Sequence, residues 1–153
     1  MEFSGIGLLI AISILAPSFL LLIFPPASPH PSGNSGLLFT LLERAGQACC
    51  LLLLVFSHDN FENAPVNAAF VLMAACITVY YGLWLRYLSR GRHITLLYDS
   101  LGPIPIPMAV FPVLAFGFAA IWGNSPWIGI TTIVLAVGHW ITSWKTRGIL
   151  AKS

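Results

Sequence analysis

Glu43 and Arg44 are the residues of this chain best suited to chemistry, because they place a carboxylate beside a guanidinium within an otherwise apolar segment, 37–57. A bilayer admits ionisable groups at depth only where protein or trapped water satisfies them. Adjacent residues on a helix point about 100° apart, so each of the two charges needs a partner from another helix. This pair is therefore the strongest indication of a functional site in the sequence.

Other polar residues can complete a site around this pair. Gln47 lies four residues after Glu43 and shares its helix face. His139 offers an imidazole suited to acid–base chemistry. We expect the partners of the two charges among His139, Tyr80, Tyr81, Gln47 and Asp99.

Arg86, Arg90 and Arg92 form a basic cluster. Its simplest interpretation is topological, since such clusters mark the cytoplasmic ends of membrane helices. Arg86 and Arg90 are also four residues apart, and on a continuing helix they can jointly bind a phosphate or carboxylate. An anionic lipid headgroup is the expected ligand at this location.

Metal and thiol chemistry receive little support from the sequence. The histidines form no HxxxH or HExxH pattern, so we predict no metal site; they are His30, His58, His93 and His139. Cys49 and Cys50 are adjacent and point about 100° apart, which disfavours a disulfide between them. The sequence contains no Gly-rich phosphate loop, and it identifies no cofactor.

The elements that must position these residues are membrane-spanning helices. The 153 residues are 58% hydrophobic and 8% charged, against roughly 25% charged in soluble proteins. No Asp, Glu, Lys or Arg occurs between Glu2 and Glu43 or within 100–144. The exposed surface is therefore expected to face lipid. The net charge of +2 is too small to indicate nucleic acid as a partner.

Five apolar segments predict an all-α integral membrane protein, a single domain over residues 1–153 built as a bundle of five transmembrane helices. The predicted spans are 3–24, 36–57, 64–86, 106–122 and 127–144. The first run is longer than a signal-peptide core and is expected to be retained. Pro17 and Pro112 predict bends within the first and fourth spans. Alternatively, the fourth and fifth segments form one re-entrant element, which leaves three true spans.

The basic residues set the orientation through the positive-inside rule. With five spans, six of the seven Lys and Arg residues fall on one side of the membrane: Arg86, Arg90, Arg92, Lys145, Arg147 and Lys152. Glu2, Asp59 and Glu62 fall on the other side. We therefore predict an outside N-terminus and a cytoplasmic C-terminus, in a bacterial cytoplasmic membrane.

This orientation places the candidate site residues at one depth. Glu43 and Arg44 lie roughly 10–12 Å inside the second span, and His139 lies roughly 9 Å from the cytoplasmic end of the fifth, at 1.5 Å per residue. Arg86 ends the third span. We therefore predict that Glu43, Arg44 and His139 line one cavity open to the cytoplasm. Two alternatives remain: the pair only links helices through hydrogen bonds, or Arg44 reaches the headgroups while Glu43 is protonated.

Three functions fit this pattern. The first is transport or binding of a small or anionic solute or lipid, which Pro17, Pro107 and Pro112 favour if they break helices at membrane depth. One copy has no second half, so transport would require a homodimer. The second is a membrane-embedded enzyme acting on a lipid or prenyl substrate, with Glu43 or His139 as acid–base. The third is an accessory or assembly subunit whose Glu43 and Arg44 pair with a partner's helices.

Overall fold

The computed structural model describes residues 2–27, 36–57 and 61–152 of the chain. Its helices are α1 (Gly5–Ile23), α2 (Leu37–Val55), α4 (Ala68–Ser89), α5 (Thr95–Tyr98), α6 (Pro107–Trp122) and α7 (Pro126–Leu150). Within these three ranges there is no strand, only an isolated bridge between Leu101 and Ile104. The predicted all-α class is therefore confirmed.

Four helices are long and apolar enough to cross a membrane, namely α1, α2, α4 and α7. This is consistent with an integral membrane protein. The fourth predicted span corresponds to α6, which has 16 residues. At 1.5 Å per residue such a helix rises about 24 Å, short of the roughly 30 Å of a bilayer core. Helix length and composition therefore assign four candidate spans and leave α6 as a shorter apolar helix.

Two helices differ from the predicted spans at their ends, for identifiable reasons. α4 begins at Ala68 instead of residue 64, because the Asn67 side chain caps it by accepting a hydrogen bond from the Phe70 backbone N–H at 3.2 Å. α7 continues past residue 144 to Leu150. Basic residues near a helix C-terminus interact favourably with the helix dipole, so the basic tail extends the helix.

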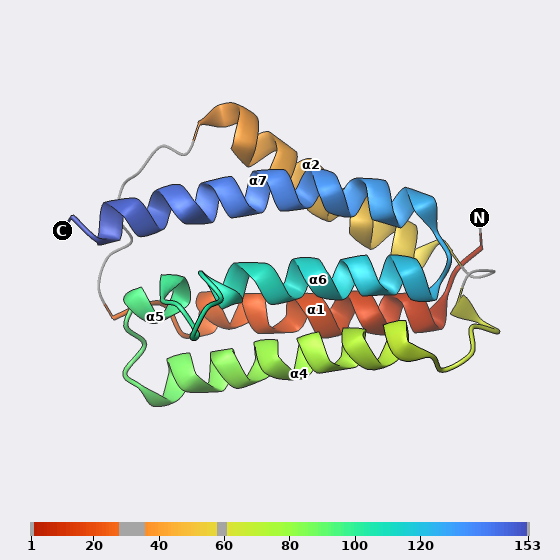
Figure 1. Cartoon of the computed structure of the whole chain (residues 1–153), viewed down its shortest axis with the longest axis horizontal. Helices are drawn as coiled ribbons and strands as arrows, with labels where there is room; N and C mark the ends of the chain where they lie inside the picture. Colours follow the sequence, from red (N-terminus) through yellow and green to blue (C-terminus); the bar gives the residue numbers. More distant parts are fainter. Residues whose placement is uncertain (1, 28–35, 58–60, 153) are drawn as a thin grey trace.

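α6 is the central helix of the fold. It lies beside α1, α4 and α7 along the long axis of the molecule, while α2 crosses that axis at an angle (Figure 1). Nine of the 16 residues of α6 are buried, against three of 19 in α2. The two chain ends lie at opposite ends of the long axis (Figure 1).

Pro17 and Pro112 lie inside α1 and α6, and neither proline ends its helix. Each removes one helical N–H donor, yet the surrounding helices hold the chain in helical conformation on both sides. Pro107 stands at the start of α6, where its missing N–H has no helical partner to lose. The helix breaks expected from these prolines therefore do not occur.

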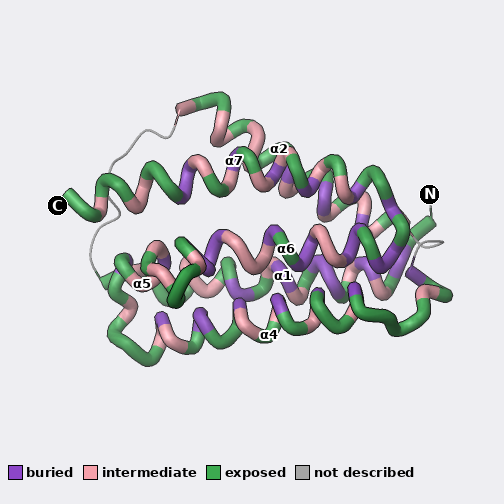
Figure 2. The backbone as a smooth tube through the Cα atoms, in the orientation of Figure 1, coloured by how far each residue is buried: buried purple, intermediate pink, exposed green. Residues whose placement is uncertain are grey.

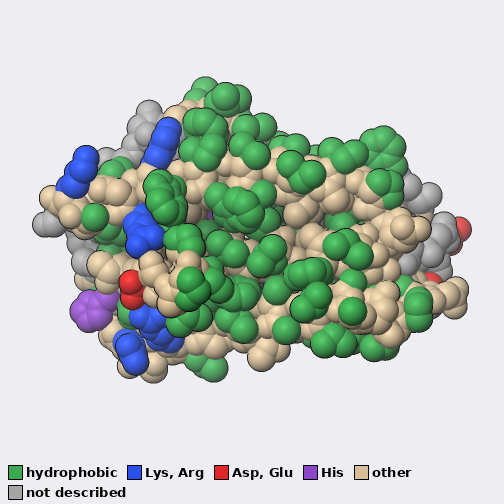
Figure 3. All heavy atoms as spheres, viewed as in Figure 1, with side chains coloured by type: hydrophobic (Ala, Val, Ile, Leu, Met, Phe, Trp, Pro, Cys, Tyr) green, Lys and Arg blue, Asp and Glu red, His purple; other side chains and the backbone are tan. Residues whose placement is uncertain are grey.

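The outer surface of the bundle is apolar. Buried residues alternate with intermediate and exposed ones along the long helices (Figure 2). Many of the exposed side chains are large hydrophobic ones, such as Leu22 at 80% and Leu37 at 74% exposure. Hydrophobic side chains are spread over the whole face seen in Figure 3, and the Lys and Arg side chains gather at the end where α4 and α7 finish. Such a surface is suited to lipid.

Two glycines bring α2 and α7 into backbone contact. A Cβ on Gly138 would meet the backbone nitrogen of Glu43 and lie 2.8 Å from its Cα. A Cβ on Gly46 would lie 2.6 Å from the backbone nitrogen of Leu135. Because these neighbours are backbone atoms of a packed helix, they cannot move aside easily. The crossing thus holds Glu43 directly against the helix that carries His139.

Candidate functional site

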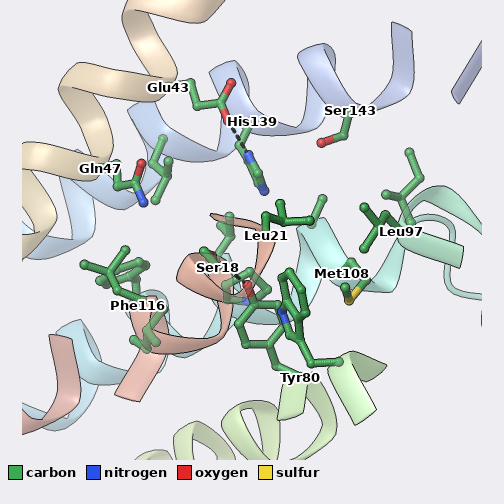
Figure 4. A pocket seen from close by; sticks show the side chains of 18 of the residues that line it. Ser18, Leu21, Glu43, Gln47, Tyr80, Leu97, Met108, Phe116, His139 and Ser143 are labelled. Atoms are coloured by element: carbon green, nitrogen blue, oxygen red, sulfur yellow. Dashed lines mark hydrogen bonds and ion pairs between the residues drawn. The ribbon is translucent and has the colours of Figure 1, made fainter. Parts of the chain in front are cut away.

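A cavity of about 360 Å³ lies inside the bundle, between α2 and α7 on one side and α1, α4, α5 and α6 on the other (Figure 4). Five of the seven residues predicted from the sequence line it: Glu43, Arg44, Gln47, Tyr80 and His139. The other two, Arg86 and Arg90, do not line this cavity. Glu43, Arg44 and His139, which were expected at one depth, therefore lie around a single cavity.

The Glu43 carboxylate joins α2 to α7. Its Oε1 lies 2.7 Å from His139 Nδ1, and its Oε2 accepts a hydrogen bond from the Thr142 hydroxyl at 2.9 Å. His139 and Thr142 are three residues apart on α7, so they occupy the same helix face. Both carboxylate oxygens are thus bonded within the chain. Glu43 therefore links α2 to α7.

The imidazole of His139 presents its second nitrogen to the cavity. An ionised carboxylate only accepts hydrogen bonds, so in the bond with ionised Glu43 the hydrogen belongs to Nδ1. Nε2 then lies on the opposite edge of the ring, which points away from Glu43 and into the cavity (Figure 4). A carboxylate that fixes an imidazole in this way leaves Nε2 able to accept or deliver a proton.

Three polar side chains of the same wall have hydrogen-bonding capacity to spare. Arg44, Gln47 and Ser143 line the cavity, and within the described part of the chain their side chains make no hydrogen bond or ion pair. Ser143 is only 7% exposed. Arg44 is exposed and Gln47 is half-buried. The wall formed by α2 and α7 is therefore equipped to bind polar atoms of a ligand.

Tyr80 lies on the opposite wall and bonds a different residue from the one expected. Its hydroxyl is 3.0 Å from Ser18 Oγ on α1, and it does not pair with Glu43 or Arg44. Trp84, one turn further along α4, packs edge-on to Tyr80 with ring centroids 6.3 Å apart. The rest of this wall is mainly apolar. Tyr80 thus belongs to the cavity but not to the charged pair.

The arginine cluster lies at the basic end of the bundle. Arg86 Nη2 donates to Asp99 Oδ2 at 2.9 Å, so Asp99 pairs with Arg86 instead of with Glu43 or Arg44. Arg90 caps the C-terminus of α4. The joint binding of an anion by Arg86 and Arg90 is therefore opposed by the acidic partner that Arg86 already holds.

The short helix α5 forms part of the cavity wall at this basic end. Its Leu97 and Tyr98 line the cavity. The following residue, Asp99, is held by Arg86 from α4, and the Ser100 hydroxyl accepts a hydrogen bond at 2.9 Å from Arg147 of α7. The segment is thus tied to two helices at once.

Sequence reasoning missed Thr142, Ser143 and Tyr98. The first two had a detectable signal, since they follow His139 by three and four residues and share its helix face. Tyr98 had none, because its position depends on how α5 folds back over the bundle. Burial raises the pKa of the Tyr98 phenol, and a hydrogen bond with Thr146 opposes that shift.

The described ranges show no group of residues suited to a metal ion, and their cysteines are free. No three His, Cys, Asp or Glu side chains of residues 2–27, 36–57 and 61–152 come together in a way that suits a metal ion. His30 and His58 lie outside those ranges. Cys49 and Cys50 are free thiols; Cys50 is buried and its Sγ lies 3.3 Å from the Thr131 hydroxyl.

Comparison with known proteins adds no relative. No protein-family model, no curated protein and no solved structure matches this chain. Its function must therefore be argued from the cavity.

Proposed function

We propose that this chain crosses the membrane five times and binds or transports a small anionic solute or lipid in the cavity between α2–α7 and the other helices. One observation carries the proposal: Arg44 lines the cavity and has no hydrogen-bond or ion-pair partner among the described residues. An unpaired guanidinium in the wall of a membrane cavity favours a ligand that brings negative charge.

Charge supports an anion over a cation. The Glu43 carboxylate already accepts bonds from His139 and Thr142. Arg44 offers several N–H donors in a fixed fork that matches carboxylate and phosphate oxygens. Gln47 and Ser143 add an amide and a hydroxyl on the same wall. An anion would accept from all three, whereas a cation would meet the like charge of Arg44.

The opposite wall supports a ligand that is also partly apolar. It consists largely of hydrophobic side chains from α1 and α6, among them Ile14, Val113 and Phe116. A fully hydrated ion would gain nothing from these contacts. A carboxylate or phosphate carrying an apolar group fits both walls.

The cytoplasmic orientation of the cavity rests on the basic end of the bundle. The Lys and Arg side chains gather there (Figure 3), and Leu97 and Tyr98 carry the cavity wall to that end. The positive-inside rule assigns such an end to the cytoplasm of a bacterial membrane. α6 supplies the fifth crossing, because a central helix shielded by its neighbours need not match the lipid thickness.

The proposal is tested with decanoate, a simple ligand that joins one carboxylate to an apolar tail. Binding is measured by native mass spectrometry in mild detergent for the wild type, Arg44→Gln and the matched control Lys152→Gln, which removes an exposed charge. A hydrogen bond to a charged group contributes about 1.5–3 kcal/mol, so Arg44→Gln should weaken binding about 10-fold or more. Equal affinity of all three proteins would refute the proposal, as would failure of the wild type to bind.

A membrane-embedded enzyme is the second candidate, favoured by the 2.7 Å contact between Glu43 and His139 Nδ1. With Nε2 facing the cavity, His139 is placed to act as a general base or acid on a bound lipid or prenyl substrate. Total lipid extracts from cells expressing the wild type and His139→Gln are compared by mass spectrometry. This candidate predicts a lipid species converted only by the wild type, and identical extracts would contradict it.

A further inference from the structure

A second hollow lies outside the cavity, as a groove of about 210 Å³ between α1 and α4. On α4 its residues recur at the spacing of one helix face, and on α1 they surround Pro17. None of the described residues that line it is charged; they are Ala16, Pro17, Leu20, Tyr81, Trp84, Leu85 and Leu88. A narrow, wholly uncharged groove on the outer face of membrane helices is suited to a hydrocarbon chain.

Two backbone hydrogen bonds and one from a tyrosine hydroxyl tie the two sides of this groove together at its basic end. The N–H of Ala27, which follows α1, donates to the carbonyl of Arg92 at 3.1 Å. The N–H of Arg92 donates to the carbonyl of Tyr87 at 3.1 Å, and the Tyr87 hydroxyl donates to the carbonyl of Phe24 at 3.1 Å. Arg92 is therefore fixed where α1 and α4 meet.

A left-handed turn makes this arrangement possible. Gly91 has φ 77° and Arg92 has φ 56°. Glycine adopts such a conformation readily, whereas for arginine it is uncommon. The turn reverses the chain immediately after α4, and the bonds to Ala27 and Tyr87 hold Arg92 in it. The chain thus accepts some backbone strain in order to place a basic residue at the end of the groove.

Two of the arginines at this end, Arg90 and Arg92, have no side-chain partner among the described residues. Arg90 caps α4 two residues after Leu88, the last groove residue of that helix. The side chains of Arg90 and Arg92 make no hydrogen bond or ion pair with any residue of the described ranges. Arg86 differs from them, because Asp99 already binds it. Two unpaired cations therefore stand where an uncharged groove ends.

We propose that the α1–α4 groove is a specific site for one anionic glycerophospholipid of the bilayer. An acyl chain lies along Leu20 and Leu85, and the phosphate is bound by Arg90 and Arg92. Charge complementarity favours this occupant: a zwitterionic lipid would bring a cation to two arginines, and an uncharged apolar partner would leave them unpaired. The proposal does not depend on the function of the inner cavity, because among the described residues Trp84 alone lines both.

The headgroup is tested by native mass spectrometry of the purified full chain with phosphatidylglycerol and phosphatidylcholine of identical acyl chains. The wild type should retain one phosphatidylglycerol at least about 10-fold more strongly than phosphatidylcholine. Arg90→Gln/Arg92→Gln should abolish this preference. The control Lys145→Gln/Lys152→Gln removes the same charge and should keep it. Equal retention of the two lipids by the wild type, or loss of the preference in the control, would overturn the proposal.

The groove is tested with a matched pair of tryptophan substitutions. Leu85 and Ile133 are both lipid-facing, at 67% and 66% exposure, but only Leu85 lines the groove. Leu85→Trp should fill it and reduce phosphatidylglycerol retention about 10-fold, while Ile133→Trp should leave retention unchanged. Far-UV circular dichroism verifies that both variants are folded. Equal retention by the two variants would overturn the groove as the acyl site. Displacement of the lipid by millimolar glycerol phosphate would also overturn the proposal, because it would assign the arginines to a free phosphate.

Discussion

Replacing Gly138 with alanine tests the packing that builds the candidate site. The added Cβ would meet the backbone nitrogen of Glu43 and lie 2.8 Å from its Cα. Overpacking of this kind destabilises by about 1–3 kcal/mol. Moving Glu43 away from α7 also weakens its bonds to His139 and Thr142, and a hydrogen bond to a charged group contributes about 1.5–3 kcal/mol. Alanine favours the helix more than glycine does, which offsets the loss in the free energy of unfolding by about 1 kcal/mol.

The expected net effect of Gly138→Ala is a loss of about 1.5–5 kcal/mol in the free energy of unfolding. Gly148→Ala is the matched control on the same helix, since no heavy atom lies within 4 Å of its added Cβ. The control should be unchanged or stabilised by up to about 1 kcal/mol. Unfolding is followed by far-UV circular dichroism during titration of mixed micelles with sodium dodecyl sulfate. Stabilities of the two variants within about 0.5 kcal/mol of each other would refute the backbone contact.

Three further predictions concern single contacts and the topology. Thr142→Val removes the 2.9 Å hydrogen bond to Glu43 and should lower the free energy of unfolding by about 1–3 kcal/mol. The control is Thr78→Val, because among the described residues the Thr78 hydroxyl bonds only the Ala74 carbonyl of its own helix; it should change stability by less than about 0.5 kcal/mol. Equal losses in the two variants would contradict the role of Thr142 in linking α7 to Glu43. Arg86→Gln and Asp99→Asn each break an ion pair whose side chains are 26% and 52% exposed. Because solvent screens such a pair, each variant should change the free energy of unfolding by no more than about 1 kcal/mol. A loss above about 2 kcal/mol in the same denaturant titration would contradict the screening of this ion pair by solvent. In a cysteine-free background, Glu2→Cys and Lys152→Cys should react with a membrane-impermeant thiol reagent from opposite sides of the membrane; reaction from one side would exclude five crossings.

Depth along a helix was the part of the site that the sequence could provide. Counting residues from the span ends placed Glu43 and His139 at one level, and in the structure the two side chains are 2.7 Å apart. The fold class could also be predicted from the sequence, because long uncharged segments in lipid are expected to form helices. Helix ends were less accessible, because a cap such as Asn67 acts through one local hydrogen bond.

The sequence could not predict how each helix is rotated about its own axis or which helices lie next to each other. Tyr80 was expected to bind the charged pair, but it lies on the opposite wall and bonds Ser18. Asp99 was expected in the same role, but the fold of α5 brings it to Arg86. Counting residues along a span predicts how deep a residue lies in the membrane, but it does not predict which helix packs against it. That choice depends on close packing at sites such as Gly46, whose contact with Leu135 has no periodic signal in the sequence.

The glycine crossing has a mechanical consequence. α2 and α7 touch through their backbones at Gly46 and Gly138, so neither can slide or separate without tearing the Glu43 bridge. α4 packs against α6, and α6 packs in turn against α7, where Trp140 Nε1 donates to the Ala109 carbonyl at 3.2 Å. The cavity therefore lies between the α2–α7 pair and the α4–α6 pair, which α6 and α7 connect. Any movement of α2 would carry α7 with it, so the Glu43 carboxylate and the His139 imidazole would stay together.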